Sequence, residues 1–375
     1  MGWRSGELTR MSATIPSVSP TPAGDPDQPS GAGPGGPTPR RGIDLRMVLG
    51  FGLSAALLVW ALWGVDLAEV GRQLRQANLW LLGAAAVAGT SLFLLRAARW
   101  QLILTPVGER LPIGPLWRAT AVGGMVTNVI PARVGEVARA YALTRELPRV
   151  PFSTALASIA VDRVFDAIVI FLLTFLAMLD PAFPRGVEIA GRPAAALLAG
   201  WGAAALLVLA AGLYAVALFP ERWSALAGRL VGRVAPRMAA GVERIVLAFA
   251  TGLGVLKHPG RFAAVLAWTL AHWLMNAFAF WLAFKAVGGR APATAMLFVQ
   301  GILAIGVALP AAPGFFGAFE KFGEIGLGVY GVPKAQAVTW AMGYHLLSFV
   351  PITLIGAVYA ARLGLRLGDF TKGRR

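Results

Sequence analysis

The chain has 375 residues, of which 57% are hydrophobic and 14% are charged, and its mean hydropathy is +0.66. An average soluble domain carries about 25% charged residues, so we do not expect a single water-soluble domain. The 34 Lys and Arg residues outnumber the 18 Asp and Glu residues, which gives a net charge of +16. Because the basic residues lie between long apolar segments, they are typical of the flanks of membrane helices, and we expect no nucleic-acid partner.

The composition also limits the chemistry that the chain can perform. The sequence contains no cysteine, so disulfides, thiolate metal sites and cysteine nucleophiles are excluded. Its three histidines, His258, His272 and His345, are widely separated, which argues against a histidine metal cluster. We therefore expect neither a metal ion nor another cofactor.

The first 46 residues are rich in proline, glycine, serine and threonine, and they contain no long apolar segment. Such a segment buries too little apolar surface to offset the entropy lost on ordering. We predict that residues 1–46 form a disordered cytoplasmic tail.

The rest of the chain contains six long apolar segments. A hydrocarbon core about 30 Å thick needs about 20 apolar residues in a helix. The six segments are residues 47–65, 79–95, 158–179, 194–219, 262–284 and 335–360. Two further apolar regions, residues 116–143 and 293–330, are interrupted by proline, glycine and charged residues. The sequence therefore predicts an all-α polytopic membrane protein with six full transmembrane helices and two broken, re-entrant helical hairpins.

Lysine and arginine are concentrated in one set of flanks, to which Arg96 and Arg99 belong, and this predicts that both termini are cytoplasmic. The pattern of residues 47–179 then recurs in residues 194–361, with an external loop at 180–193 and a basic tail at 362–375. Each half crosses the membrane an odd number of times, so we predict an inverted repeat, as in many transporters. Chance is the alternative, because proline and glycine are frequent in membrane helices.

Residues 220–261 form a basic loop inside the second half. Its apolar residues Trp223, Leu226 and Leu230 fall largely at helical spacing between arginines. This pattern predicts amphipathic helices that lie on an anionic cytoplasmic leaflet. A simple topology anchor is the alternative interpretation.

The first interrupted region carries charges that point to function. Asn128 and Pro131 break the helix, and Arg133, Glu136 and Arg139 then recur every three residues along one helical face. Charged groups inside a membrane are costly unless they are paired or hydrated, and for this reason they usually mark a functional site. The alternative is a salt-bridge stripe that only fixes the hairpin.

The next apolar segment adds Asp162, Arg163 and Asp166. The two aspartates lie one helical turn apart, and Arg163 is placed to reach Asp166. These groups could contact Arg133 or Arg139, or bind a cationic headgroup. An internal ion pair explains the spacing equally well.

The second interrupted region carries Glu320 and Glu324 on one face, after the break at residues 310–317. His345 lies in the last apolar segment, and its partner cannot be assigned from the sequence. A hydrogen-bonded structural histidine is a more common role than a proton relay. Trp100 lies near the end of a predicted span, as expected for a tryptophan at the membrane interface.

Four segments together resemble a known family. They are Leu95–Trp100, Asn128–Ala140, Asp162–Asp166 and Pro313–Glu320, and in this order they are similar to the transmembrane region of lysylphosphatidylglycerol synthases, a family also described as flippase-like. The likeness extends over about residues 45–362. Family members often have glutamate where Asp162 stands and a second glycine where Phe315 stands.

The resemblance implies the lipid-translocating membrane region alone, without the aminoacyl-transferase domain of full-length synthases. We therefore expect a lipid flippase or transporter of the bacterial inner membrane rather than an enzyme. Arginines would neutralise a lipid phosphate, and carboxylates would hold a cationic or hydroxylated headgroup. The predicted substrate-binding residues are Asn128, Arg133, Glu136, Arg139, Asp162, Arg163, Asp166, Glu320 and His345.

The expected partners are membrane phospholipids with an anionic or aminoacylated headgroup. Two alternatives remain. One is a membrane-embedded enzyme that modifies a lipid headgroup, with Glu136, Asp162 and Asp166 as acid, base or metal ligands. The other is a membrane partner of a separate transferase. The sequence leaves the oligomeric state open, with a homodimer among the alternatives.

Overall fold

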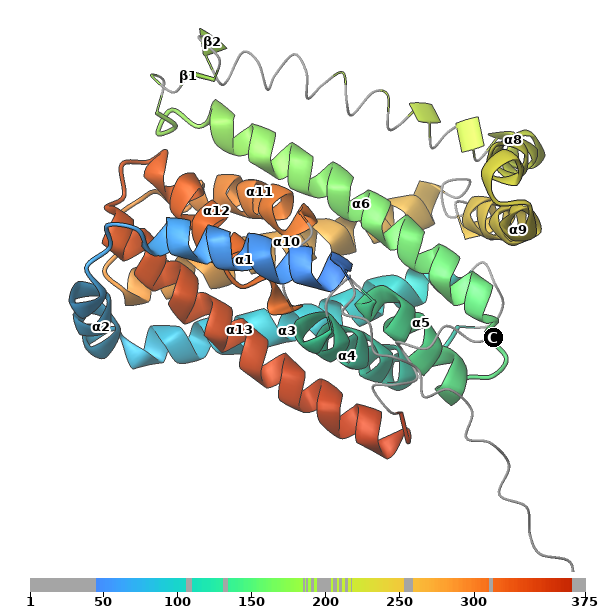
Figure 1. Ribbon diagram of the computed structural model, residues 1–375, viewed down its shortest axis with the longest axis horizontal. Coiled ribbons are helices and arrows are strands. Elements are labelled where there is room, and N and C mark those ends of the chain that lie inside the picture. Colours follow the sequence, from blue (N-terminus) through green and yellow to red (C-terminus); the bar gives the residue numbers. More distant parts are fainter. Residues whose placement is uncertain are drawn as a thin grey trace, which may run out of the picture. The chain divides into compact units, whose positions relative to one another are not determined.

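The computed structural model of the protein describes residues 45–105, 110–130, 134–184, 218–252, 259–309 and 313–365, together with separate residues between 186 and 216. The described part of the chain is almost entirely helical (Figure 1). The predicted tails at 1–46 and 362–375 and the predicted span at 194–219 lie largely outside the described residues.

The first half contains α1 (Leu45–Leu62), α2 (Leu67–Gln76), α3 (Leu79–Leu104), α4 (Ile113–Val129), α5 (Gly135–Glu146) and α6 (Phe152–Leu179). The second half contains α8 (Pro220–Val234), α9 (Pro236–Gly252), α10 (Pro259–Ala286), α11 (Ala295–Ala308), the 3-10 turn η3 (Pro313–Phe315), α12 (Ala318–Gly328) and α13 (Lys334–Arg362). Between the halves, β1 (Glu188–Ile189) and β2 (Arg192–Pro193) pair antiparallel. The prediction of an all-α fold is confirmed for the described residues, and the one short β pairing among them lies in the predicted external loop.

Three helices among the described residues are long and apolar enough to cross a membrane: α3 with 26 residues, α10 with 28 and α13 with 29. A span needs about 20 residues, so each of the three is sufficient. α6 also has 28 residues, but Asp162, Arg163 and Asp166 interrupt its apolar sequence. The structure thus supports a membrane protein, and the six full spans and the inverted repeat stay predictions.

Polar side chains fix the starts of two helices in the first half. Asp66 accepts hydrogen bonds from the backbone N–H groups of Ala68 and Glu69 at the start of α2. Asn78 accepts from Trp80 and Leu81 in the same way at the start of α3. Each cap satisfies backbone donors that have no partner within the helix.

The first interruption is present where the sequence predicts it. α4 ends at Val129 and α5 begins at Gly135, while Pro131, Ala132 and Arg133 lie outside the described residues. The two helices pack closely through glycines, since a Cβ atom built on Gly123 would lie 2.8 Å from the carbonyl oxygen of Gly135. Small residues allow helix backbones in a membrane protein to approach in this way.

The second interruption is also present, between the end of α11 at Ala308 and the start of α12 at Ala318. Gly314 and Gly317 adopt positive φ values of 68° and 84°, which glycine accepts without steric conflict. Phe315 has a φ of 60°. This conformation disfavours a bulky side chain, and glycine would adopt it without steric conflict.

The basic loop at 220–261 forms two helices, α8 and α9, and part of α10. α8 and α9 lie beside each other near one end of α6 (Figure 1). Leu226, Leu230 and Met238 are exposed on this pair, among several arginines. The predicted helices are confirmed, and their contact with a lipid leaflet stays a prediction.

Candidate functional site

A buried arginine joins the two aspartates of α6. The side chain of Arg99, from α3, is fully buried, and its Nη2 atom lies 2.5 Å from Oδ1 of Asp162. Its Nη1 atom donates a hydrogen bond of 2.7 Å to Oδ1 of Asp166. Because a guanidinium presents several donors in one plane, it can hold both carboxylates at once.

Three more arginines surround the same carboxylates. Arg139 of α5 donates to Oδ2 of Asp162 at 3.0 Å. Arg163 lies 3.2 Å from Oδ2 of Asp166 and 3.2 Å from Oε1 of Glu136. Arg96 lies 3.6 Å from Oδ2 of Asp166.

We call this set the arginine–aspartate cluster; it comprises Arg96, Arg99, Glu136, Arg139, Asp162, Arg163 and Asp166. Its four arginines and three carboxylates give a formal net charge of +1, counted over these seven described side chains. A charge imbalance inside a membrane protein is costly, and an anionic ligand would neutralise it.

Two tryptophans hold the cluster in place. The Arg139 guanidinium lies 4.0 Å from the centre of the Trp100 ring, and Trp100 Nε1 donates to Ser158 at 2.8 Å. Trp273 of α10 donates to Oδ1 of Asp166 at 2.8 Å. Trp100 is fully buried, so its ring packs inside the protein and does not face lipid headgroups, as an interfacial belt tryptophan would. The Arg139 guanidinium lies over the face of the Trp100 ring, because a cation is attracted to the face of an indole ring.

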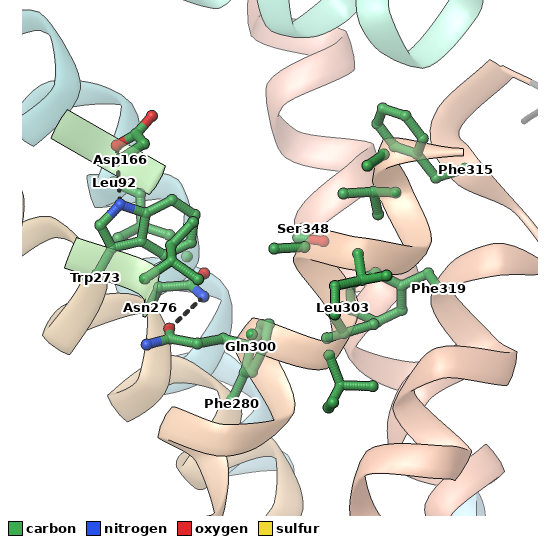
Figure 2. A pocket seen from close by; sticks show the side chains of 18 of the residues that line it. Leu92, Asp166, Trp273, Asn276, Phe280, Gln300, Leu303, Phe315, Phe319 and Ser348 are labelled. Atoms are coloured by element: carbon green, nitrogen blue, oxygen red, sulfur yellow. Dashed lines mark hydrogen bonds between the residues drawn. The ribbon is translucent and has the colours of Figure 1, made fainter. Parts of the chain in front are cut away.

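A cavity of about 850 Å³ opens beside the cluster. α3, α4, α6, α10, α11, α12 and α13 all contribute side chains to it. Asn128, Arg163 and Asp166 line one part, whereas most of the remaining wall is apolar, including Phe171, Leu303 and Phe319. Figure 2 shows Asp166 and Trp273 on one wall and Phe315, Phe319 and Ser348 on the facing side. The cavity therefore places charged groups next to an apolar surface.

Both interrupted hairpins contribute to this cavity. Asn128, at the end of α4, donates to Thr353 Oγ1 at 2.8 Å and to the Phe349 carbonyl at 3.3 Å, which ties the first interruption to α13. Gly314 and Phe315, from the second interruption, also line the cavity. Described residues beside both interruptions thus line one cavity.

The second interruption contains a buried acid–base pair. His345 Nδ1 lies 2.6 Å from Oε1 of Glu320, and His345 Nε2 lies 2.7 Å from the Gly314 carbonyl oxygen. The other carboxylate oxygen of Glu320 accepts a hydrogen bond of 2.6 Å from the N–H of Gly317. Because a carbonyl can only accept, Nε2 donates to Gly314. Glu320 and His345 together hold the turn at residues 313–317.

Comparison with known proteins identifies a membrane-protein family. The family model described as the lysylphosphatidylglycerol synthase TM region matches residues 47–356. The chain belongs to this family. It is also similar to glycosyltransferase AglD from Haloferax volcanii, with 33% identity over 153 residues, which are 40% of this chain and 24% of that protein. The chain thus spans about a quarter of the length of this curated relative. No solved structure matches the chain.

The structure of this family member brings together most of the predicted site residues. Glu136, Arg139, Asp162, Arg163 and Asp166 meet in the arginine–aspartate cluster. Glu136 of α5 pairs with Arg163 of α6. Their role in binding a lipid stays a prediction.

The remaining described site residues lie outside the cluster, although Asn128 and His345 line the same cavity as Arg163 and Asp166. Asn128 contacts α13, and Glu320 and His345 contact each other at the second interruption. Arg133 lies outside the described residues. The sequence-based prediction also missed Arg96 and Arg99, which were assigned to a basic flank. The signal was available, because both residues belong to one of the four segments that carry the family resemblance, and α3 continues beyond them to Leu104.

Proposed function

We propose that this protein moves a phospholipid between the two leaflets of the membrane. The headgroup phosphate would bind at the polar part of the cavity, and the acyl chains would follow its apolar wall into the bilayer. One observation carries the proposal: residues of the net positive cluster and an apolar surface line the same cavity. Desolvation of the headgroup opposes unassisted exchange, and groups of opposite charge placed in the path lower that barrier.

Arg163 is the side chain best placed to receive the phosphate. It lines the cavity and its side chain is 38% exposed, whereas that of Arg99 is fully buried between the two aspartates. A guanidinium binds phosphate oxygens with two parallel hydrogen bonds. We assign phosphate binding to Arg163 and a scaffold role to Arg99.

The proposal includes the inverted repeat of six full spans. Transporters built in this way place their site where interrupted helices meet, near the middle of the membrane. The two interruptions of this chain both line the cavity, which supports the same arrangement here. We also propose that both termini are cytoplasmic, because lysine and arginine are concentrated in one set of flanks. The proposed location in a bacterial inner membrane follows from the family resemblance.

A headgroup-modifying enzyme is less well supported by the geometry. Asp162 is ion-paired with Arg99 and Arg139, and Asp166 with Arg99 and Arg163. Guanidinium groups already engage both carboxylates, so neither aspartate is placed to take a proton from a substrate. The second candidate function is therefore a membrane partner of a separate transferase, which is favoured by the similarity to a protein named as a glycosyltransferase.

Reconstitution in liposomes distinguishes these functions. The purified protein is placed in vesicles with fluorescent phosphatidylglycerol, and a reducing agent that cannot cross the bilayer quenches only the outer leaflet. Transport predicts loss of more than half of the fluorescence without any covalent change of the lipid. A new lipid species would instead support an enzyme. Absence of both, with transfer restored by an added transferase, would support the partner function.

Replacement of Arg163 by glutamine tests the proposed phosphate site. We expect the rate of lipid exchange to fall by about 10-fold to 100-fold, because a hydrogen bond to a charged group contributes about 1.5–3 kcal/mol. Arg118→Gln is the matched control, since Arg118 forms a partly buried ion pair with Glu146 and does not line the cavity. Equal rates in the Arg163 variant and in the control would remove Arg163 from the site.

A further inference from the structure

A buried amide donor in the cavity wall is not explained by the phosphate site. Gln300 is 2% exposed and lines the cavity. Its side-chain oxygen accepts a hydrogen bond of 3.2 Å from Nδ2 of Asn276. Its Nε2 atom is buried and has no hydrogen-bond partner among the residues that the structure describes. Figure 2 shows this pair of amides on the same wall as Trp273.

The surroundings make this donor unusual. Within α11, all of whose residues are described, Gln300 is the single polar side chain. Phe280, Phe298 and Leu303 line the same cavity, so the amide faces an apolar environment. A buried amide without a partner is destabilising, and an intramembrane polar group of this kind is a candidate ligand contact. A bound molecule with an acceptor oxygen would satisfy the donor.

The position of the amide pair relative to the cluster indicates which part of a bound lipid it would contact. Trp273, which donates to Asp166, and Asn276 are three residues apart on α10. A helix rises about 1.5 Å per residue, so Asn276 lies about 4.5 Å further along the axis than Trp273. The amide pair thus lies close to the charged part of the cavity, on the side of its apolar wall. A lipid whose phosphate is bound at Arg163 would place the atoms between its headgroup and its acyl chains beside the amide pair.

We infer that the Asn276–Gln300 pair is a binding site for an ester carbonyl of the lipid glycerol backbone. The inference rests on the proposed function and adds a selection between lipid classes to it. In a diacyl phospholipid the ester carbonyls are neutral acceptors a few bonds from the phosphate, on the side of the acyl chains. Ether-linked phospholipids and polyprenyl phosphates have no carbonyl at this place, so they leave Gln300 Nε2 unsatisfied. Rejection of a ligand that leaves a buried polar group unpaired is a general source of specificity.

A binding experiment in detergent tests this inference separately from transport. The purified full-length chain is titrated with short-chain diacyl phosphatidylglycerol and with its dialkyl ether analogue, and binding is followed by native mass spectrometry. We expect the ester lipid to bind about 10-fold more tightly, which corresponds to one neutral hydrogen bond together with the unpaired donor that its loss leaves. The wild-type comparison needs no variant and so does not depend on folding of a mutant.

Two variants locate the preference. Gln300→Met keeps the length of the side chain and removes the amide, so it should bind both lipids equally. Gln336→Met is the matched control, because Gln336 donates to the Val287 carbonyl at 3.0 Å and does not line the cavity. It should keep the preference for the ester lipid.

Each outcome decides the inference. Equal affinity of the wild type for the two lipids, or an unchanged preference in the Gln300 variant, would overturn it even if the protein transports lipid in vesicles. Binding of neither lipid would overturn both the inference and the proposed function. An ester preference that Gln300→Met removes would support the site, whether or not the vesicle assay shows transport.

Discussion

Replacement of Arg99 by methionine is expected to destabilise the folded protein by about 3–5 kcal/mol, the loss typical when one partner of a buried ion pair is removed. Arg99 is fully buried and contacts both Asp162 and Asp166. Without it, the two carboxylates keep only Arg96, Arg139 and Arg163 as cationic partners among the described residues. Thermal unfolding of the purified protein in detergent measures the change.

The control for this prediction is an exposed ion pair of the same chemical type. Arg72 of α2 pairs with Glu69, and its side chain is 62% exposed. Arg72→Met should leave the unfolding temperature almost unchanged, because exposed ion pairs are screened by water. If Arg99→Met unfolds at the same temperature as the Arg72 variant, the buried cluster does not hold α3 against α6.

A second substitution separates charge from packing. Adding Asp162→Asn to the Arg99→Met protein removes one of the carboxylates that Arg99 had neutralised. We expect the double variant to be more stable than the sum of the two single changes predicts, because the two residues are in direct contact. Strict additivity would show that the loss comes from packing around the arginine stem.

Replacement of Gly135 by alanine is expected to destabilise the protein by about 2–3 kcal/mol, in the upper part of the range for overpacked sites. A Cβ atom at this position would lie 2.5 Å from the Gly123 carbonyl oxygen and would also overlap the side chain of Thr127. Helices α4 and α5 would have to separate, and Arg139 would move away from Asp162. We therefore expect lipid exchange to fall together with the unfolding temperature.

Gly71→Ala is the matched control for this change. Gly71 lies within α2, and a Cβ atom there meets no other atom within 4 Å. Alanine has the higher helix propensity, so this variant should be as stable as the wild type or more stable by up to about 1 kcal/mol. A Gly135 variant that behaves like the Gly71 variant would show that the α4–α5 contact tolerates a larger separation.

The sequence by itself determined the features that depend on composition and on near neighbours along the chain. Hydropathy identified a membrane protein, and the family resemblance is confirmed by the match over residues 47–356. Proline and glycine marked both interruptions, where α4 ends at Val129 and α12 begins at Ala318. The contact between Arg163 and Asp166 was predictable, because residues three positions apart in a helix lie close together on one face.

The tertiary structure alone decided which groups meet across helices. Arg99 pairs with Asp162 and Asp166, His345 with Glu320, and Gln300 with Asn276, and the members of each pair lie at least 24 residues apart in the chain. Such contacts depend on the rotation and tilt of each helix, which a pattern of apolar residues leaves open when most faces of a membrane helix are apolar. Packing through glycines such as Gly123 and Gly135 fixes these angles, and only then do the isolated polar residues acquire partners.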